Sequence, residues 1–201
     1  MYLFLDSTKN ITVGLLSDTC EWVDYQYLVS KKSSSEIHPL IYSLFEKHQL
    51  SFDDMTGVFF CAGPGSYTGM RVTAGITDIM QWYGLSIHTF YHFEVPSWCG
   101  HDEGVWLGKA FKGEVFIFKW NNHPGESNKS LVAEDLLENS LKNDKKNIFC
   151  GHEEFMEINP IKTKDLIYKY PREVFRAVLQ KNKKQDLYYY RSLDNEFVRK
   201  K

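Results

Sequence analysis

The residues best suited to chemistry form a glycine-rich turn, Gly63-Pro64-Gly65-Ser66-Tyr67-Thr68-Gly69-Met70-Arg71, between an apolar run and a helical pattern. Such turns place backbone N–H groups at the start of a helix, where they can bind an anion. The spacing is neither of the two common nucleotide motifs. Gly69 lacks the following Lys of a P-loop, and Thr68 replaces the third glycine of G-x-G-x-x-G. Spacing alone therefore favours a structural turn, in which glycines permit positive φ and Thr68 caps the helix.

The histidine spacing does not predict a metal site. His88 and His92 lie four residues apart in a segment with a strand-like pattern, and such residues are about 13 Å apart along a strand. One ion needs at least two converging imidazoles. Glu114 follows Gly113, a position typical of a solvated or ion-paired carboxylate, and no catalytic triad can be inferred. We expect no metal and no catalytic residue.

Composition limits the possible classes of protein. The 201 residues, 43% of them hydrophobic, suit one large domain or two small ones. A net charge of −2 is not typical of a nucleic-acid-binding protein. Cys20, Cys61, Cys99 and Cys150 are widely spaced, as expected of reduced thiols. No apolar run approaches the roughly 18 residues of a membrane span, and the start reads as a strand and not a signal peptide. We predict a cytoplasmic protein without membrane contact.

The elements before the glycine-rich turn read as three strands and a helix. Residues 2–5, 11–16 and 21–29 predict an antiparallel meander. Ser33-Ser34-Ser35-Glu36 resembles a capping box for a helix that ends near residue 48. Pro39 suits a first helical position, so the regular helix can instead begin there. The apolar face of this helix comprises Ile37, Leu40, Ile41, Leu44 and Phe45.

The rest of the chain predicts a second strand–helix unit and then a smaller α/β half. A strand over 57–62 leads through the turn into a helix that reaches about residue 83, and Gly84 stops it. We assign Val72, Ile76, Ile79, Met80 and Tyr83 to its apolar face. Further strands are expected over 85–91, 105–107, 114–120, 148–151 and 166–168, a loop over 121–130, and helices over 133–141 and 172–180. A boundary near residue 95 predicts lobes of 1–94 and 95–201.

The whole turn, rather than its spacing, carries a family resemblance. Gly63 to Val72 is similar to the GPGSFTGxRIG signature of the TsaB family, the YeaZ-type proteins. The opening Met1 to Thr8 resembles the family's first strand, and Ser35 to Ile41 resembles its H-S-E-x-L-L-P-x-I helix. Ala110 to Phe116 and Leu187 to Arg191 are similar to its D-A-R-x-G-E-V-Y and P-x-Y-L-R segments. The resemblance is strong over residues 1–92 and patchy beyond.

The resemblance implies an actin-like ASKHA (ribonuclease H-like) fold of two lobes, the second one reduced. It also implies a non-catalytic scaffold that binds a TsaD-like protein. With a TsaE-like ATPase, these proteins place threonylcarbamoyl on the adenosine next to the anticodon of tRNAs that read ANN codons. TsaB-type proteins also pair with themselves through the same N-terminal helices, and we expect tRNA contact only within the complex.

Site residues follow from the same resemblance. The motif loop comprises Gly63, Pro64, Gly65, Ser66, Tyr67, Thr68, Gly69 and Arg71. The expected partner surface comprises Ile37, Leu40, Ile41, Tyr42, Leu44, Phe45, Met70, Thr73, Ile76, Met80 and Trp82. Tyr42 and Trp82 fall off the apolar faces and are of the type that anchors interfaces, and Thr73 stands where the family has glycine. Asp6, Ser7 and Thr8 would lie near a weakly bound nucleotide, although Asp6 can equally bond the N–H groups of its own turn.

Two other functions stay open. The chain can be an enzyme, either a Gcp-like glycopeptidase or an actin-like ATP-dependent phosphotransferase. It can also be a stand-alone homodimer with a regulatory role. The basic end of the chain favours a solvated segment and leaves open a contact with tRNA; it includes Lys181, Lys183, Lys184, Arg191, Arg199, Lys200 and Lys201.

Overall fold

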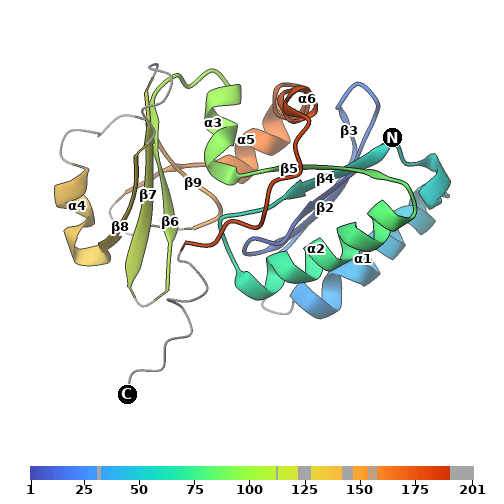
Figure 1. Ribbon diagram of the computed structural model, residues 1–201, viewed down its shortest axis with the longest axis horizontal. Coiled ribbons are helices and arrows are strands. Elements are labelled where there is room, and N and C mark those ends of the chain that lie inside the picture. Colours follow the sequence, from blue (N-terminus) through green and yellow to red (C-terminus); the bar gives the residue numbers. More distant parts are fainter. Residues whose placement is uncertain are drawn as a thin grey trace.

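The computed structural model describes residues 1–30, 33–111, 113–121, 128–141, 147–153, 155 and 158–190. Two five-stranded sheets stand side by side, with helices between them and on the outer faces (Figure 1). The strands of the first sheet come from the start of the chain, and those of the second follow residue 103. The fold is mixed α/β, as the sequence predicts.

The first sheet has the order β3-β2-β1-β4-β5. Its strands are β1 (Tyr2–Asp6), β2 (Ile11–Leu16), β3 (Trp22–Leu28), β4 (Gly57–Cys61) and β5 (Ser86–Phe90). The first three pair antiparallel, which confirms the predicted meander, whereas β4 and β5 run parallel to β1. Because β1 lies at the centre, the turns that follow β1 and β4 meet at one edge of the sheet.

Helices α1 (Ser33–His48) and α2 (Tyr67–Trp82) cover one face of this sheet (Figure 1). Helix α1 begins at Ser33, so the alternative start at Pro39 is wrong. Ile37 is fully buried in the same cluster as Ile41 and Leu44. These side chains share one face only if the turn before the proline is already helical.

Helix α2 packs on the sheet with a face that matches the expected one only in part: Val72, Ile76 and Met80 pack there as predicted. Met70 and Thr73 are fully buried with Ile76 and Met80, whereas Ile79 and Tyr83 are exposed. The helix lies close to the sheet, so small and polar side chains are also found on the face that packs on the core. The apolar periodicity of the sequence alone therefore located only part of that face. The cap is also corrected, since the Ser66 hydroxyl, not Thr68, accepts from the Gly69 amide. Gly84, with φ of +93°, follows the helix as predicted.

The second sheet has the order β10-β9-β6-β7-β8. Its strands are β6 (Gly104–Lys109), β7 (Glu114–Trp120), β8 (Asn128–Ala133), β9 (Ile148–Cys150) and β10 (Ile161–Lys162). Strand β8 begins inside the expected 121–130 loop, of which residues 122–127 lie outside the described residues. The expected 133–141 helix is a short 3₁₀ turn, Glu134–Leu136, followed by α4 (Leu137–Ser140).

One aromatic core joins the two sheets. Between them lie a 3₁₀ turn, His92–Glu94, and three helices: α3 (Val95–Trp98), α5 (Thr163–Lys169) and α6 (Pro171–Lys181). Phe175 of α6 packs on Phe4, Phe59 and Phe90 of the first sheet, in a cluster that also contains Trp106 of the second. The predicted strand at 166–168 is wrong. That segment is part of α5, because adjacent Leu166 and Ile167 are both buried in this core, which an alternating strand would not achieve.

The last described segment, residues 182–190, returns along the first sheet (Figure 1). The Tyr188 amide donates to the Ala62 carbonyl. Lys184 in this segment pairs with Asp78, and Lys181 at the end of α6 pairs with Glu94. The predicted basic residues Arg191, Arg199, Lys200 and Lys201 lie outside the described residues. Within the described ranges, no helix is long and apolar enough to cross a membrane.

Candidate functional site

The glycine-rich loop packs tightly against the turn between β1 and β2. A Cβ atom on Gly65 would come within 2.3 Å of the Thr8 carbonyl oxygen, and the Ser66 amide donates to that same oxygen. Gly63 has φ of +127° and lies against the Tyr188 backbone. Both glycines therefore permit close backbone approach.

The rest of the loop forms the first turn of α2. Pro64 and Gly69 are buried, and Thr68 is exposed. The Arg71 guanidinium donates to the Tyr67 hydroxyl and lies 5.2 Å from the centre of that ring. These contacts fix the first turn of α2, which forms one edge of a pocket.

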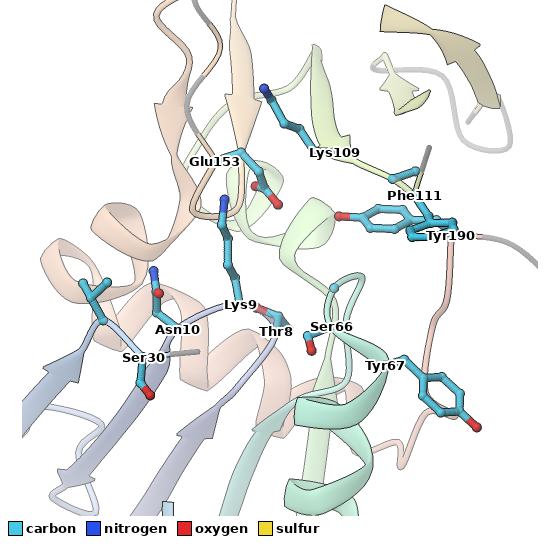
Figure 2. Close-up of a pocket in the computed structure, with 13 residues that line it drawn as sticks. Thr8, Lys9, Asn10, Ser30, Ser66, Tyr67, Lys109, Phe111, Glu153 and Tyr190 are labelled. Atoms are coloured by element: carbon cyan, nitrogen blue, oxygen red, sulfur yellow. The ribbon is translucent and has the colours of Figure 1, made fainter. Parts of the chain in front are cut away.

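That pocket, of about 850 Å³, lies between turns of the first sheet and turns of the second (Figure 2). It is lined by Thr8, Lys9, Asn10, Val29, Ser30, Gly65, Ser66, Tyr67, Lys109, Ala110, Phe111, Glu153 and Tyr190. Lys9 extends from the turn between β1 and β2 toward Glu153, which follows β9, while the Tyr190 hydroxyl points inward from the opposite side (Figure 2). The wall carries charges of both signs, two lysines and Glu153, and the Lys109 ammonium pairs with Glu134 at 3.1 Å.

Of the three residues expected near a nucleotide, the structure brings only Thr8 to the pocket wall. Ser7 is buried, and its hydroxyl lies 2.5 Å from the Thr73 hydroxyl of α2. Asp6 is buried behind the wall. Neither Asp6 nor Ser7 lines this pocket, because Asp6 faces His92 and His152, whereas Ser7 faces Thr73 of α2.

Asp6 forms a buried cluster with two histidines. Its Oδ2 atom lies 3.1 Å from His92 Nε2 and 3.1 Å from His152 Nε2. Its Oδ1 atom accepts from the Thr8 amide at 2.9 Å and the Thr8 hydroxyl at 2.7 Å. On the far side of the His92 ring, Nδ1 lies 2.9 Å from the Thr163 hydroxyl, which donates to the Cys150 carbonyl.

The electrostatics of this cluster follow from burial and proximity. Burial alone would raise the pKa of Asp6, but the two imidazoles hold that pKa well below its usual range. Burial would lower the pKa of His92, but the neighbouring Cys61 and the Asp6 carboxylate raise it well above its ordinary value. The cluster thus stabilises a carboxylate that faces positive charge.

The sequence pattern relates His92 only to His88, predicts no metal site there, and does not connect His92 with His152. His152 follows β9, which pairs with β6 and so belongs to the second sheet. No local spacing in the sequence therefore connects the His92 and His152 rings. The structure agrees that His88 does not share a site with His92. His88 lies in β5 and packs on Tyr2 and Phe59, and burial lowers its pKa.

The outer surface of α1 and α2 is the second candidate site. It exposes large rings: Trp82 is 85% exposed, Tyr83 73% and Tyr42 67%. With Phe52 and Ile79, these residues form what we call the α1/α2 surface. A groove of about 350 Å³ crosses it, lined by His38, Ile41, Tyr42, Phe45, Phe52, Ile76, Ile79 and Met80.

Several residues expected at this surface do not reach it. Ile37, Leu44, Met70 and Thr73 are all fully buried against the first sheet. Since each helix needs its apolar face for the core, these side chains cannot touch a partner in the folded protein. Their assignment to the partner surface is wrong, and the sequence missed Ile79 and Tyr83 by placing them in the core.

Comparison with known proteins matches both the fold and the sequence. A family model described as TsaD, tRNA N6-adenosine threonylcarbamoyltransferase, matches residues 27–85. The chain is 24% identical over 164 residues to the tRNA threonylcarbamoyladenosine biosynthesis protein TsaB of Bacillus subtilis, covering 76% of this chain and 72% of that protein.

Two solved structures share the fold. One is an uncharacterized protein with similarity to peptidase YeaZ from Pseudomonas aeruginosa, at a TM-score of 0.65 and 13% identity, over 94% of this chain and 99% of that one. The other is YeaZ from Pseudomonas aeruginosa, at a TM-score of 0.53 and 16% identity, over 66% of this chain and 67% of that one. These structures share the two-sheet α/β fold of this chain, and the sequence relative carries the TsaB name. In sequence and in fold, the chain is therefore similar to TsaB and YeaZ-type proteins.

Proposed function

We propose that this protein is a non-catalytic scaffold subunit for the threonylcarbamoylation of tRNA. In this role it binds a TsaD-like protein through the α1/α2 surface, and the pair works with a TsaE-like ATPase on the adenosine next to the anticodon of ANN-decoding tRNAs. The name of the Bacillus relative supports the pathway. The observation that carries the scaffold role is the exposed aromatic surface of α1 and α2.

The physical argument rests on side chains that the fold does not use. The inner faces of both helices are already packed on the sheet, yet Tyr42, Trp82 and Tyr83 remain mostly in water. The Phe52 and Tyr83 rings stack at 5.8 Å along the groove. Large rings around an apolar groove are typical of interface anchors. The segment that matches the TsaD family model, residues 27–85, spans both helices, which supports pairing between related lobes.

The electrostatic properties support tRNA contact only within the complex. A net charge of −2 gives the isolated chain little attraction for phosphates. The competing enzyme hypothesis, a Gcp-like glycopeptidase or an ATP-dependent enzyme, requires turnover by the isolated chain. We expect no ATP hydrolysis above the blank from the purified protein, and measurable hydrolysis would favour that alternative.

The test measures affinity for the TsaD-like protein of the same genome by calorimetry and co-purification. Replacing Trp82 or Tyr83 with Ala removes an exposed ring, and we expect Kd to rise about tenfold or more. Tyr168→Ala is the matched control, because Tyr168 is also an exposed ring but lies on α5. Binding that is absent at micromolar concentrations, or is equally weakened by Tyr168→Ala, would contradict the proposal.

Self-pairing through the same surface makes a separate prediction. Sedimentation should show dimers of the protein alone that dissociate on Trp82→Ala. The TsaD-like protein should replace one copy, because both partners would need the same rings. The prediction would be contradicted by a complex that contains two copies of this chain joined through Trp82 and also a bound TsaD-like protein. In that case self-pairing and TsaD binding would not use the same surface.

A further inference from the structure

The Asp6 cluster brings three potential metal ligands together from different parts of the chain. Asp6 ends β1, His92 begins the 3₁₀ turn after β5, and His152 follows β9 of the second sheet. Their ligand atoms all lie within 4.8 Å of one another, and all three residues are buried. This convergence is independent of the α1/α2 surface and is not explained by a scaffold role.

The hydrogen bonds of His92 fix which ring nitrogen faces the Asp6 carboxylate and the Thr8 hydroxyl, which lies 3.0 Å from Nε2. The Thr163 hydroxyl has one proton, which it donates to the Cys150 carbonyl at 2.9 Å. It can therefore only accept from His92 Nδ1, which must carry a proton. In the neutral ring, His92 Nε2 then directs a lone pair at the Asp6 carboxylate, 3.1 Å away. Only a second proton or a metal ion between these atoms makes the contact attractive.

The surrounding bonds are those of a metal-binding histidine. A ligating imidazole usually donates its other N–H to an oxygen that fixes the ring, as His92 does to Thr163. The Thr8 amide and hydroxyl hold the other carboxylate oxygen, Asp6 Oδ1, and so fix Oδ2 toward both rings. The two imidazoles stand at 85° to one another, so their Nε2 atoms approach the carboxylate from different directions.

The distances fit a small ion. Ligands at about 2.0–2.1 Å from a tetrahedral Zn²⁺ lie roughly 3.3 Å apart, close to the 3.1 Å between Asp6 Oδ2 and each Nε2 atom. Two imidazoles and one carboxylate are the donors that divalent transition metals prefer, whereas Mg²⁺ and Ca²⁺ prefer all-oxygen sites. We propose that Asp6, His92 and His152 form a binding site for a divalent transition metal, with Zn²⁺ as the ion that fits best.

The site has a structural consequence. Asp6 belongs to the first sheet and His152 to the second, so a shared ion crosslinks the lobes. The cluster also adjoins the pocket between the lobes through Thr8, which bonds Asp6 and lines that pocket. Metal binding should therefore raise the unfolding temperature and hold the two walls of the pocket in one arrangement.

The test begins with the wild-type full chain, freed of metal by chelator and dialysis. Zn²⁺ competition against a chromogenic chelator should give one tight site per chain, and Co²⁺ should give the visible absorption bands of four-coordinate cobalt. His152→Gln and Asp6→Asn should each weaken binding by more than about 100-fold, because they remove a ligand. Thr163→Val should cost about tenfold, since it only releases the outer nitrogen of His92.

His88→Gln is the matched control, because it removes an imidazole that lies in the neighbouring strand but outside the cluster. It should bind Zn²⁺ like the wild type. Circular dichroism checks that each variant is folded. If a variant unfolds, anomalous diffraction from wild-type crystals grown with Zn²⁺ gives the location directly. The proposal is overturned if the wild type takes up no stoichiometric Zn²⁺ at micromolar concentration, if a folded His152→Gln binds normally, or if the anomalous peak lies elsewhere.

Discussion

Gly65 approaches Thr8 so closely that a Cβ atom on the glycine would lie 2.3 Å from the Thr8 carbonyl oxygen. Since the obstacle is backbone, no rotamer change can relieve the contact. We expect Gly65→Ala to lower the free energy of unfolding by about 1–3 kcal/mol, the usual cost of overpacking. Urea unfolding of the purified protein measures this loss.

Gly75→Ala is the control for that substitution. Gly75 lies within α2, and a Cβ atom there would meet nothing within 4 Å. The same chemical change should stabilise the protein by about 0.5–1 kcal/mol, because alanine restricts the unfolded chain and favours the helix. Equal effects of the two substitutions would show that the approach of Gly65 to Thr8 is unimportant.

Two neighbours on α1 should separate stability from binding. Leu44 is fully buried, whereas Tyr42 is mostly exposed. We expect Leu44→Ala to cost about 2–5 kcal/mol through the cavity that it leaves, and Tyr42→Ala to stay within about 0.5 kcal/mol. Thermal unfolding checks both. A large stability loss in Tyr42→Ala would mean that its ring supports the fold and is not available to a partner.

Asp24 should make stability depend on pH. Burial would raise the pKa of this carboxyl, but hydrogen bonds from Lys47, His48 and the Tyr25 amide lower it below its ordinary value of 3.8. A lowered pKa in the folded state stabilises the protein above pH 3.8, and this contribution is lost as pH falls through the folded-state pKa. Asp24→Asn should therefore be less stable than the wild type at neutral pH, by about 1 kcal/mol.

The comparison of the two proteins by urea unfolding at several pH values tests this sign. The stability gap between wild type and Asp24→Asn should be widest at neutral pH and narrow below pH 3.8, as the wild-type carboxyl takes up a proton. A gap that stays constant across that range would mean that the ion pairs of Asp24 contribute nothing.

Local patterns in the sequence predict most of the first lobe. The strands of the meander, the two helices and the stop at Gly84 each have a short-range signal, and the structure contains them. The second lobe was predicted less well because its elements are short and depend on distant packing. The segment at Leu166 is apolar and could be a strand by its pattern, and only the core between the sheets makes it a helix.

The candidate sites show the same limit. Tyr42 and Trp82 could be identified as exposed because they fall outside the apolar faces of their helices. The contact between His92 and His152 could not, because it depends on how the second sheet is placed against the first. Helix orientation also depends on tertiary contacts: Thr73 faces the core because Ser7 offers it a hydrogen-bond partner there.

That last contact allows a double-mutant test of the orientation of α2. The Ser7 and Thr73 hydroxyls are buried and lie 2.5 Å apart. Thr73→Val keeps the shape but leaves the Ser7 hydroxyl without this partner, so it should cost about 1–3 kcal/mol, and Ser7→Ala should cost a similar amount. The double variant should be more stable than the sum of the two losses predicts, because neither hydroxyl then remains to be satisfied. Urea unfolding of all four proteins measures this coupling. Strictly additive costs would mean that the two hydroxyls do not bond to each other in solution.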